Sequence, residues 1–506
     1  MHPLGQGCER GVRSVTIVGG GTAGWMAAAA LARVLEGAAC QIALVESPDQ
    51  GAVGVGEATI PSLPAFHALL GIDEREFLAA ARATFKLAIQ FCDWGAPGER
   101  FLHPFGPYGL DNRHELFQAY WLKRRREGRP STLAEWSVTG LAATLGRFAA
   151  APPGEASPLR WLSYAYHLDA ALYGRFLRSY AQKRGVRRIE GQIVDVMLDG
   201  RGCIDAVRLR DGRMIGGDFF IDCSGFRSLL LAQTLKVGYL DWSHWLPCDR
   251  AVALQCEGGA EQVPFTQATA LECGWQWRIP LQHRLGNGHV YCSAYLSDDQ
   301  AATQLLGRLG GAPLADPRFL RFTTGRREKA WVGNCLALGL AAGFLEPLES
   351  TGIHLIQTGL ARLFALFPDR HFDPAVSAEY NRLSGLEYEH IRDFLMLHYA
   401  AAGREDSPFW RHCRAMRPPD SLAYRWELFL KTGRIATLEQ ETFRPASWLA
   451  VFTGLNIWPE RYEPLIDLLP DAHMTAHFEA MRGKIRAAVE GLPAHTTYLR
   501  EVAEHV

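Results

Sequence analysis

Residues 14–25 of this 506-residue chain read SVTIVGGGTAGW, and this stretch decides the fold class. Its first five residues form a β-branched run that favours a strand, and the alanine-rich stretch after Trp25 favours a helix ending near Leu35. The connection carries three glycines at the spacing G-x-G-x-x-G, namely Gly19, Gly21 and Gly24. At such a turn the backbone can approach a pyrophosphate, which lies on the positive end of the helix. The stretch therefore predicts a dinucleotide-binding α/β fold.

The segments that follow favour FAD over NAD. A second strand, residues 41–45, ends at Glu46, whose carboxylate can accept hydrogen bonds from ribose hydroxyls. A second glycine-rich loop, GVGEATIP, occupies residues 54–61, where an NAD domain would continue as regular strand–helix units. Two later segments are residues 217–225, which contain Asp222, and residues 333–339. Each is either an ordinary buried strand or a segment that the fold brings back into contact with one extended cofactor. We therefore expect a Rossmann-like module of the hydroxylase or glutathione-reductase type.

Composition excludes several classes of partner. The chain has 53 basic and 54 acidic residues, so it lacks the positive field that would hold a nucleic acid or an anionic membrane. Its 11 cysteines show no paired spacing, which predicts reduced thiols and neither disulfides nor a metal site. The first twelve residues contain no apolar leader segment, and no apolar run is long enough to cross a bilayer. We expect a cytoplasmic protein.

The chain divides loosely into two units. We expect an FAD-binding module over 13–365, within which residues 81–159 contribute to a substrate-binding layer. Residues 366–506 have a mainly helical pattern and are expected to complete the substrate side. The overall expectation is an α/β protein whose flavin module is interleaved with a mainly helical layer.

Two segments carry unusual side chains within apolar surroundings. Lys86 lies in TFKLAIQF, where burial would lower the pKa of its ammonium group, although it could also be a surface lysine that extends its charge to water. Trp275 and Trp277 lie at strand spacing in GWQWRIP, which puts both indoles on one face of a strand. The simpler alternative for the two tryptophans is a core or edge strand.

A third segment, FLEPLESTGI at 344–353, precedes a predicted helix that reaches about Leu366. The backbone N–H groups of Ser350, Thr351 and Gly352 at a helix start are suited to binding an anion. Glu349 is a carboxylate among apolar residues, so we expect a raised pKa and a role in proton transfer. A capped helix with a solvated acid is the alternative.

Together these motifs resemble the flavin-dependent tryptophan halogenase family, in order and over nearly the whole chain. WxWxIP combined with the early lysine is the specific part, because related flavin hydroxylases share only the glycine fingerprint. The resemblance implies halogenation of an electron-rich aromatic by FADH2, O2 and chloride or bromide, with reduced flavin supplied by a separate reductase. It also implies a homodimer. An aromatic monooxygenase on the same fold and a flavin-binding protein without turnover are the competing interpretations.

The resemblance also implies a mechanism. A flavin hydroperoxide would oxidise a halide held near Thr351 and Gly352 to hypohalous acid, which moves through an internal tunnel to Lys86. Lys86 would polarise the acid or hold it as a haloamine, and Glu349 would take the proton from the substrate. Trp275 and Trp277 would form the wall between flavin and substrate.

The remaining site residues also follow from the resemblance. The flavin would contact the glycine turn, both glycine loops and the returning strands, through Gly19, Gly21, Thr22, Ala23, Gly24, Glu46, Val55, Gly56, Ala58, Val194, Asp222, Leu340 and Ile353. His103, Phe105 and Trp448 would flank the aromatic substrate. Members specific for free tryptophan hold its amino-acid part with a tyrosine pair and an acid, whereas Leu449 and its neighbours here are apolar. We therefore expect indole, a substituted indole or a tryptophan residue in a peptide to be at least as good a substrate.

Overall fold

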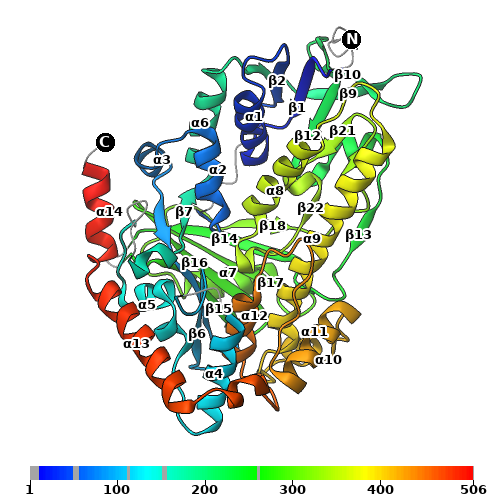
Figure 1. Ribbon diagram of the computed structural model, residues 1–506. Coiled ribbons are helices and arrows are strands. Elements are labelled where there is room, and N and C mark those ends of the chain that lie inside the picture. Colours follow the sequence, from blue (N-terminus) through cyan, green and yellow to red (C-terminus); the bar gives the residue numbers. More distant parts are fainter. Residues whose placement is uncertain (1–10, 49–55, 111–113, 151–156, 259–261, 505–506) are drawn as a thin grey trace, which may run out of the picture.

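A computed structural model of the chain describes residues 11–48, 56–110, 114–150, 157–258 and 262–504. The flavin-type module has at its centre a six-stranded sheet in the order β20-β21-β12-β1-β2-β8, parallel except for the β20–β21 pair. Its strands are β1 (Ser14–Val18), β2 (Gln41–Glu46), β8 (Arg187–Glu190), β12 (Phe219–Asp222), β20 (Trp331–Val332) and β21 (Cys335–Ala337). Helix α1 (Thr22–Val34) follows β1, as predicted. Figure 1 shows this sheet at the end of the molecule that carries the N-terminus.

A seven-stranded sheet forms the middle of the molecule, in the order β18-β14-β17-β16-β15-β5-β6. Its strands are β5 (Ala88–Cys92), β6 (Arg100–Pro104), β14 (Arg250–Cys256), β15 (Phe265–Leu271), β16 (Gly274–Pro280), β17 (Leu285–Tyr291) and β18 (Arg318–Arg321). Strand β5 pairs in parallel with β15, which joins the early segment to the later strands. The lysine and tryptophan motifs are therefore brought to one sheet region.

Three small sheets complete the strand structure. They consist of β3 (Gly56–Ala58), β7 (Ala165–Asp169) and β4 (Thr84–Lys86); of β9 (Ile193–Leu198), β10 (Ile204–Leu209) and β11 (Met214–Gly216); and of β13 (Tyr239–Asp241), β19 (Gly325–Arg327) and β22 (Gly343–Phe344). The β3-β7-β4 sheet aligns Lys86 with Ala165 and links the second glycine loop to the lysine strand.

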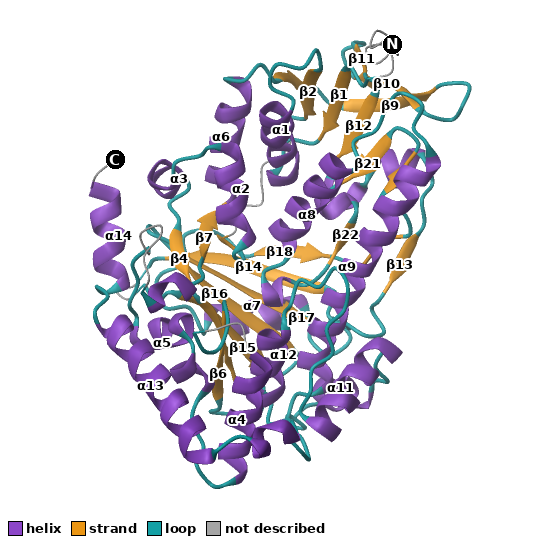
Figure 2. Ribbon diagram, viewed as in Figure 1, coloured by secondary structure: helices purple, strands orange, loops and turns teal. Residues whose placement is uncertain are grey.

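Helices cover both sheets (Figure 2). The earlier ones are α2 (Ser62–Leu70), α3 (Glu74–Ala80), α4 (His114–Arg126), α5 (Val138–Leu145), α6 (Ala170–Gln182), α7 (Asp298–Leu306) and α8 (Gly352–Ala365). The later ones are α9 (Pro374–Ala400), α10 (Pro408–Ala415), α11 (Asp420–Thr432), α12 (Pro445–Gly454), α13 (Asp471–Glu490) and α14 (His495–Glu504). The mainly helical pattern predicted for residues 366–506 is confirmed, while the proposed division into two units stays a prediction. Within the described residues, no helix combines the length and apolarity that crossing a bilayer requires.

Candidate active site

The glycine turn has the geometry that a dinucleotide requires. Gly19 has a φ of +113°, and a Cβ there would lie 2.2 Å from the carbonyl oxygen of Cys223. A Cβ on Gly24 would lie 1.8 Å from the carbonyl oxygen of Gly19, so the helix packs directly on the turn. A Cβ on Gly21, by contrast, would meet no atom of the described residues within 4 Å. Open space thus lies above the N-terminus of α1, where a pyrophosphate would lie.

The acids predicted to contact the flavin already have protein partners. The carboxylate of Glu46 lies against Gly20 and forms an ion pair with Arg188. Asp222 is fully buried, and its oxygens accept hydrogen bonds from the backbone N–H groups of Ser224, Leu230 and Leu231 at 2.8–3.0 Å. Asp222 therefore shapes the loop after β12.

The other predicted flavin residues are distributed around the turn. Thr22 and Ala23 begin α1, and Ala58 and Ile353 are buried. Leu340 is 44% exposed. It lies in a turn that packs closely on α1, since a Cβ added to the neighbouring Gly339 would lie only 2.8 Å from the Cβ of Ala23. Gly56 lies in β3, and Val194 is 46% exposed on β9. Val55 lies outside the described residues.

Lys86 is completely buried at the end of β4, so the alternative of a surface lysine is wrong. Its Nζ donates hydrogen bonds to the carbonyl oxygen of Thr59 at 3.0 Å and to Ser350 Oγ at 2.8 Å. It also lies 5.1 Å from the centre of the Phe105 ring. Burial lowers the pKa of Lys86 to about 7, although the negative charge of Glu349 partly opposes that shift. The amine and ammonium forms are therefore both available near neutral pH.

Glu349 is the buried carboxylate of the site, held between two histidines. His103 Nδ1 lies 2.9 and 3.1 Å from its two oxygens, and His398 Nε2 lies 3.0 Å from Oε1. Burial alone would raise its pKa, but the charge and hydrogen bond of His103, together with His398, lower the pKa to about 2. The expected raised pKa is therefore wrong, because the sequence did not reveal these two partners.

The loop between Glu349 and α8 offers an anion site. Ser350 has a left-handed φ of +60°, and α8 starts at Gly352 with Thr351 as its N-cap residue. Thr351 is fully buried, and its Oγ1 has no hydrogen-bond partner in the described residues. A Cβ on Gly352 would meet no described atom within 4 Å. A buried free hydroxyl and open space at a helix N-terminus suit a small anion such as a halide.

Trp275 and Trp277 project from one face of β16 as predicted, with ring centroids 6.1 Å apart. Gly288 on β17 makes room for the Trp277 indole, since a Cβ there would lie 2.0 Å from that ring. Trp275 Nε1 donates a hydrogen bond to Glu346 Oε2 at 3.0 Å. Burial raises the pKa of Glu346 to about 7, although hydrogen bonds from Tyr399 and Trp275 partly oppose that shift. The turn from Glu346 to Glu349 thus carries two buried carboxylates: Glu346 is bound by Trp275, and the charge of Glu349 acts on Lys86.

Aromatic rings line the side of Glu349 that faces α9 and α12. His103 lies 5.7 Å from Phe394 and 6.2 Å from Phe443, measured between ring centroids. Phe394 stacks on Phe443 at 3.9 Å and meets Trp448 edge-on at 4.9 Å. Phe105 adds its ring on the Lys86 side. His103, Phe105 and Trp448, all predicted to bind substrate, therefore belong to one aromatic cluster around the lysine and the carboxylate.

Sequence reasoning missed His398, Phe394 and Phe443. His398 and Phe394 lie in the apolar run FLMLHY of α9, and the histidine in that run was the available signal. Phe443 precedes α12 in a loop with no distinctive pattern.

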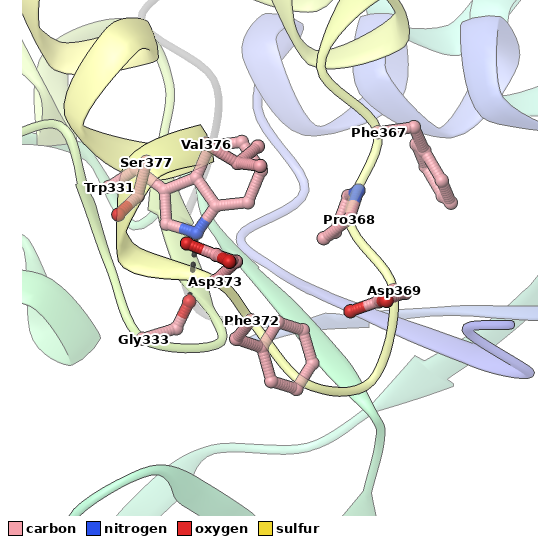
Figure 3. Close-up of a pocket in the computed structure, with 9 residues that line it drawn as sticks. All are labelled: Trp331, Gly333, Phe367, Pro368, Asp369, Phe372, Asp373, Val376 and Ser377. Carbon is pink, nitrogen blue, oxygen red and sulfur yellow. Dashed lines mark hydrogen bonds between the residues drawn. The ribbon is translucent and has the colours of Figure 1, made fainter. Parts of the chain in front are cut away.

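A separate small cavity of about 210 Å³ lies outside this site. Figure 3 shows the residues that line it, which are Trp331, Gly333, Phe367, Pro368, Asp369, Phe372, Asp373, Val376 and Ser377. None of the predicted site residues lines it.

The fold and this geometry define a class. A glycine turn with room for a dinucleotide, together with a buried lysine–carboxylate site beside two buried tryptophans, is the arrangement of a flavin-dependent oxidoreductase. The chain belongs to the tryptophan halogenase family, which it matches over residues 14–471.

Individual relatives match nearly the whole chain. A flavin-dependent halogenase structure from Xanthomonas campestris is 50% identical with a TM-score of 0.93, and BrvH, a flavin-dependent halogenase from Brevundimonas sp. BAL3, is 45% identical with a TM-score of 0.92. In both comparisons 97% of this chain and 99% of the other chain are covered. Tryptophan 6-halogenase SttH of Streptomyces toxytricini is 36% identical over 517 residues, covering 97% of this chain and 98% of the relative. The protein is therefore an enzyme, a flavin-dependent halogenase that uses FAD in its reduced form and a halide ion.

The open space at Gly21 gives a test of the flavin site. We expect Gly21→Ala to leave the melting temperature unchanged, because the added methyl meets no atom of the described residues, and to weaken FAD binding about tenfold or more by occupying the space of the pyrophosphate. Titration of FAD by fluorescence and a thermal melt measure the two effects. Gly483→Ala, in α13 with equally free space, is the matched control and should bind FAD normally. Unchanged FAD affinity in Gly21→Ala would contradict this placement.

Proposed function

We propose that this enzyme halogenates small, electron-rich aromatic compounds, above all indoles, with bromide or chloride. The observation that carries the proposal is the burial of Lys86 and Glu349 in one aromatic cluster, each held by hydrogen bonds or ion pairs. The motifs that specify flavin binding are shared with hydroxylases, whereas a buried lysine beside a carboxylate suits the activation of hypohalous acid. The hydroxylase interpretation is not favoured by the family assignment.

The chain's own residues would hold the cofactor and the halide. When bound, reduced FAD together with O2 supplies the two-electron oxidation that converts a halide ion to hypohalous acid, and a separate flavin reductase regenerates the reduced form. Gly19, Gly21 and Gly24 would hold the pyrophosphate against α1. The backbone and free hydroxyl at the start of α8, Thr351 and Gly352, would hold the halide. Trp275 and Trp277 would keep the aromatic substrate away from the flavin.

Lys86 would activate hypohalous acid by hydrogen bonding. Its ammonium has three donors, of which Thr59 and Ser350 take two. The third can donate to the oxygen of hypohalous acid and so make its halogen more electrophilic. Attack by the aromatic carbon then forms the carbon–halogen bond, and the oxygen leaves as water after gaining a proton.

The pH dependence of halogenation tests which form of Lys86 acts. Because the pKa of Lys86 is about 7, the side chain is in its ammonium form at lower pH and loses that proton as the pH rises through 7. We expect halogenation to fall above neutral pH, by about tenfold per pH unit at most, while flavin oxidation changes less. Product formation and flavin absorbance are followed in parallel. A rate that rises with pH would instead favour attack by the neutral amine and a haloamine.

Glu349 would accept the proton that the substrate loses after halogen addition. The cationic intermediate formed on the ring is a strong acid, so a carboxylate with a pKa of about 2 is basic enough to deprotonate it. The same low pKa makes subsequent release of the proton easy. Its negative charge also stabilises the cationic ring before the proton leaves.

The aromatic cluster favours a neutral substrate. The guanidinium of Arg425 lies 4.0 Å from the centre of the Trp448 indole ring. Arg425 forms a buried ion pair with Glu441, so its charge is already balanced. Leu449 to Phe452 are buried and apolar. A free amino acid whose charged end lay beside Trp448 would place its ammonium and carboxylate against these apolar residues, which is costly. Free tryptophan is the second candidate substrate, because the relative SttH is named a tryptophan 6-halogenase.

Substrate preference is tested by mass spectrometry of reactions with a generic flavin reductase, FAD and either halide. We expect the isotope pattern of a halogen on indole, with kcat/KM at least about tenfold above that for tryptophan, a ratio equivalent to about 1.4 kcal/mol. Bromide should react faster than chloride, because it is more easily oxidised. A preference for tryptophan would refute the substrate assignment, and an oxygenated product without halogen would refute the reaction.

A further inference from the structure

Trp275 has an unusual hydrogen-bond partner for a buried tryptophan of this chain. Three other fully buried tryptophans donate their indole N–H to backbone carbonyl oxygens: Trp94 to Ala268 at 3.1 Å, Trp331 to Gly333 at 2.8 Å and Trp410 to Leu271 at 2.7 Å. Trp275 donates instead to a side-chain carboxylate, with 3.0 Å between its Nε1 and Glu346 Oε2. Among the described residues, this oxygen is the one acceptor of the Trp275 N–H.

The carboxylate is a costly partner at this place. Glu346 has no exposed surface, and its Oε1 is buried without a hydrogen-bond partner in the described residues. Burial raises the pKa of Glu346 to about 7, so the charged form is disfavoured there. A backbone carbonyl satisfies an indole N–H without this penalty, as at the other three tryptophans. The presence of a carboxylate therefore favours a role beyond satisfying the indole.

Glu346 begins the turn that leads to the site carboxylate and to the start of α8. Trp275 on β16 holds the beginning of this turn through Glu346, and Lys86 on β4 holds its later part through Ser350. Glu349 lies between these two contacts. The orientation of the Trp275 indole and the position of this turn therefore depend on the same hydrogen bond.

The two tryptophans of β16 are oriented in different ways. Trp277 lies against Gly288, where a Cβ would be 2.0 Å from the indole, so close packing fixes its ring. Trp275 has a directional hydrogen bond to Glu346, which fixes the rotation of its indole plane. We propose that Glu346 is a positioning residue that holds the Trp275 indole in the wall between flavin and aromatic substrate, and so keeps the oxidant on its way to Lys86. This inference rests on the proposed function, in which Trp275 and Trp277 form that wall.

The yield of product per flavin oxidised tests the inference. The full-length enzyme is supplied with FAD, a generic flavin reductase, bromide and indole, and both halogenated indole and hypobromous acid captured by a trapping reagent are measured. Glu346→Leu has no acceptor for the indole N–H, so we expect it to lower the product yield at least about fivefold, to raise the trapped acid and to leave flavin oxidation nearly unchanged. Glu346→Gln still offers an oxygen to Trp275 and should give a nearly native yield. A native yield from Glu346→Leu would overturn the inference.

A second set of variants separates the wall from the anchoring of α9, because Tyr399 also donates a hydrogen bond to Glu346 Oε2. Tyr399→Phe removes that donor and leaves the Trp275 contact in place, so the yield should stay close to native. Trp275→Phe should lower the yield at least as much as Glu346→Leu, and combining these two changes should cause no further loss. Losses that add in the double variant, or an equal loss in Tyr399→Phe, would overturn the inference.

Indole NMR of the full-length enzyme with ¹⁵N-labelled tryptophan tests the contact without any activity measurement, with the Trp275 signal assigned by its loss in Trp275→Phe. At about pH 8, where Glu346 is mostly ionised, we expect this signal to shift in Glu346→Gln, because a neutral amide oxygen is a weaker acceptor than a carboxylate. It should stay in place in the control variant Glu389→Gln. An unmoved signal in Glu346→Gln would overturn the inference, even if Glu346→Leu does not fold. If the native enzyme forms no halogenated product, the proposed function and its wall are refuted, and the NMR shift distinguishes that failure from an absent contact.

Discussion

Replacing Lys86 with methionine is expected to reduce halogenation by about a hundredfold or more, the magnitude associated with loss of a donor aimed at the reacting atoms. Methionine has nearly the same length but can neither polarise hypohalous acid nor form a haloamine. Flavin oxidation should continue, because the glycine turn and the start of α8 are unchanged. Product is measured by mass spectrometry, and flavin oxidation is followed by absorbance in the same reaction.

The fate of the oxidant makes the Lys86 result specific. In Lys86→Met, hypohalous acid that is formed but not used should escape, and a trapping reagent in solution should capture more of it than with the native enzyme. The melting temperature should not fall, because removing a fully buried ammonium also removes its desolvation cost. Lys431→Met, a half-exposed lysine paired with Glu460, is the matched control and should halogenate normally. Retained regioselective halogenation by Lys86→Met would remove Lys86 from the mechanism.

Changing Glu349 to glutamine is expected to slow product formation by about tenfold to about a hundredfold, as loss of a positioned proton acceptor does. Glutamine has the same shape and can still pair with His103, so substrate binding should change little. What it lacks is the charge that stabilises the cationic ring and the basic oxygen that removes the proton. The rate is measured with saturating indole and bromide under steady-state conditions.

Deuterium substitution separates proton removal from a general structural effect. In Glu349→Gln, removal of the proton should become the slow step, so indole deuterated at the reacting carbon should react more slowly than ordinary indole. With the native enzyme, the two indoles should react at nearly the same rate. Glu389→Gln, a partly exposed acid paired with Arg326, is the control and should show neither effect. An unchanged rate and no isotope effect in Glu349→Gln would refute the assignment of Glu349.

The local patterns were sufficient for the flavin module. The strand–glycine–helix unit at 14–34 forms as predicted, because each step depends on short-range properties: β-branched residues in β1, glycines where Cβ atoms would clash, and alanines in α1. The same holds for the i, i+2 placement of Trp275 and Trp277, because alternation along a strand is fixed by the backbone. The motif at 346–353 likewise predicted the start of α8.

Other features of the site depended on residues that are distant in the chain. Glu349 receives His398 from α9 and His103 from β6, and no local pattern around position 349 contains either contact. That is why burial, the only property visible in the sequence, predicted a raised pKa, whereas the two histidines lower it. For Lys86, the sequence left two alternatives, and only packing against Thr59, Ser350 and Phe105 decided between them.

The sequence by itself therefore determined the fold class and the glycine turn, and it supplied the side chains to which we assign the chemistry, since these follow from local backbone geometry and side-chain type. The tertiary structure alone decided their charge states and their neighbours. The pKa of a buried group is set by the charges and dipoles within a few ångströms of it, and here they come from strands and helices that are far apart in the chain.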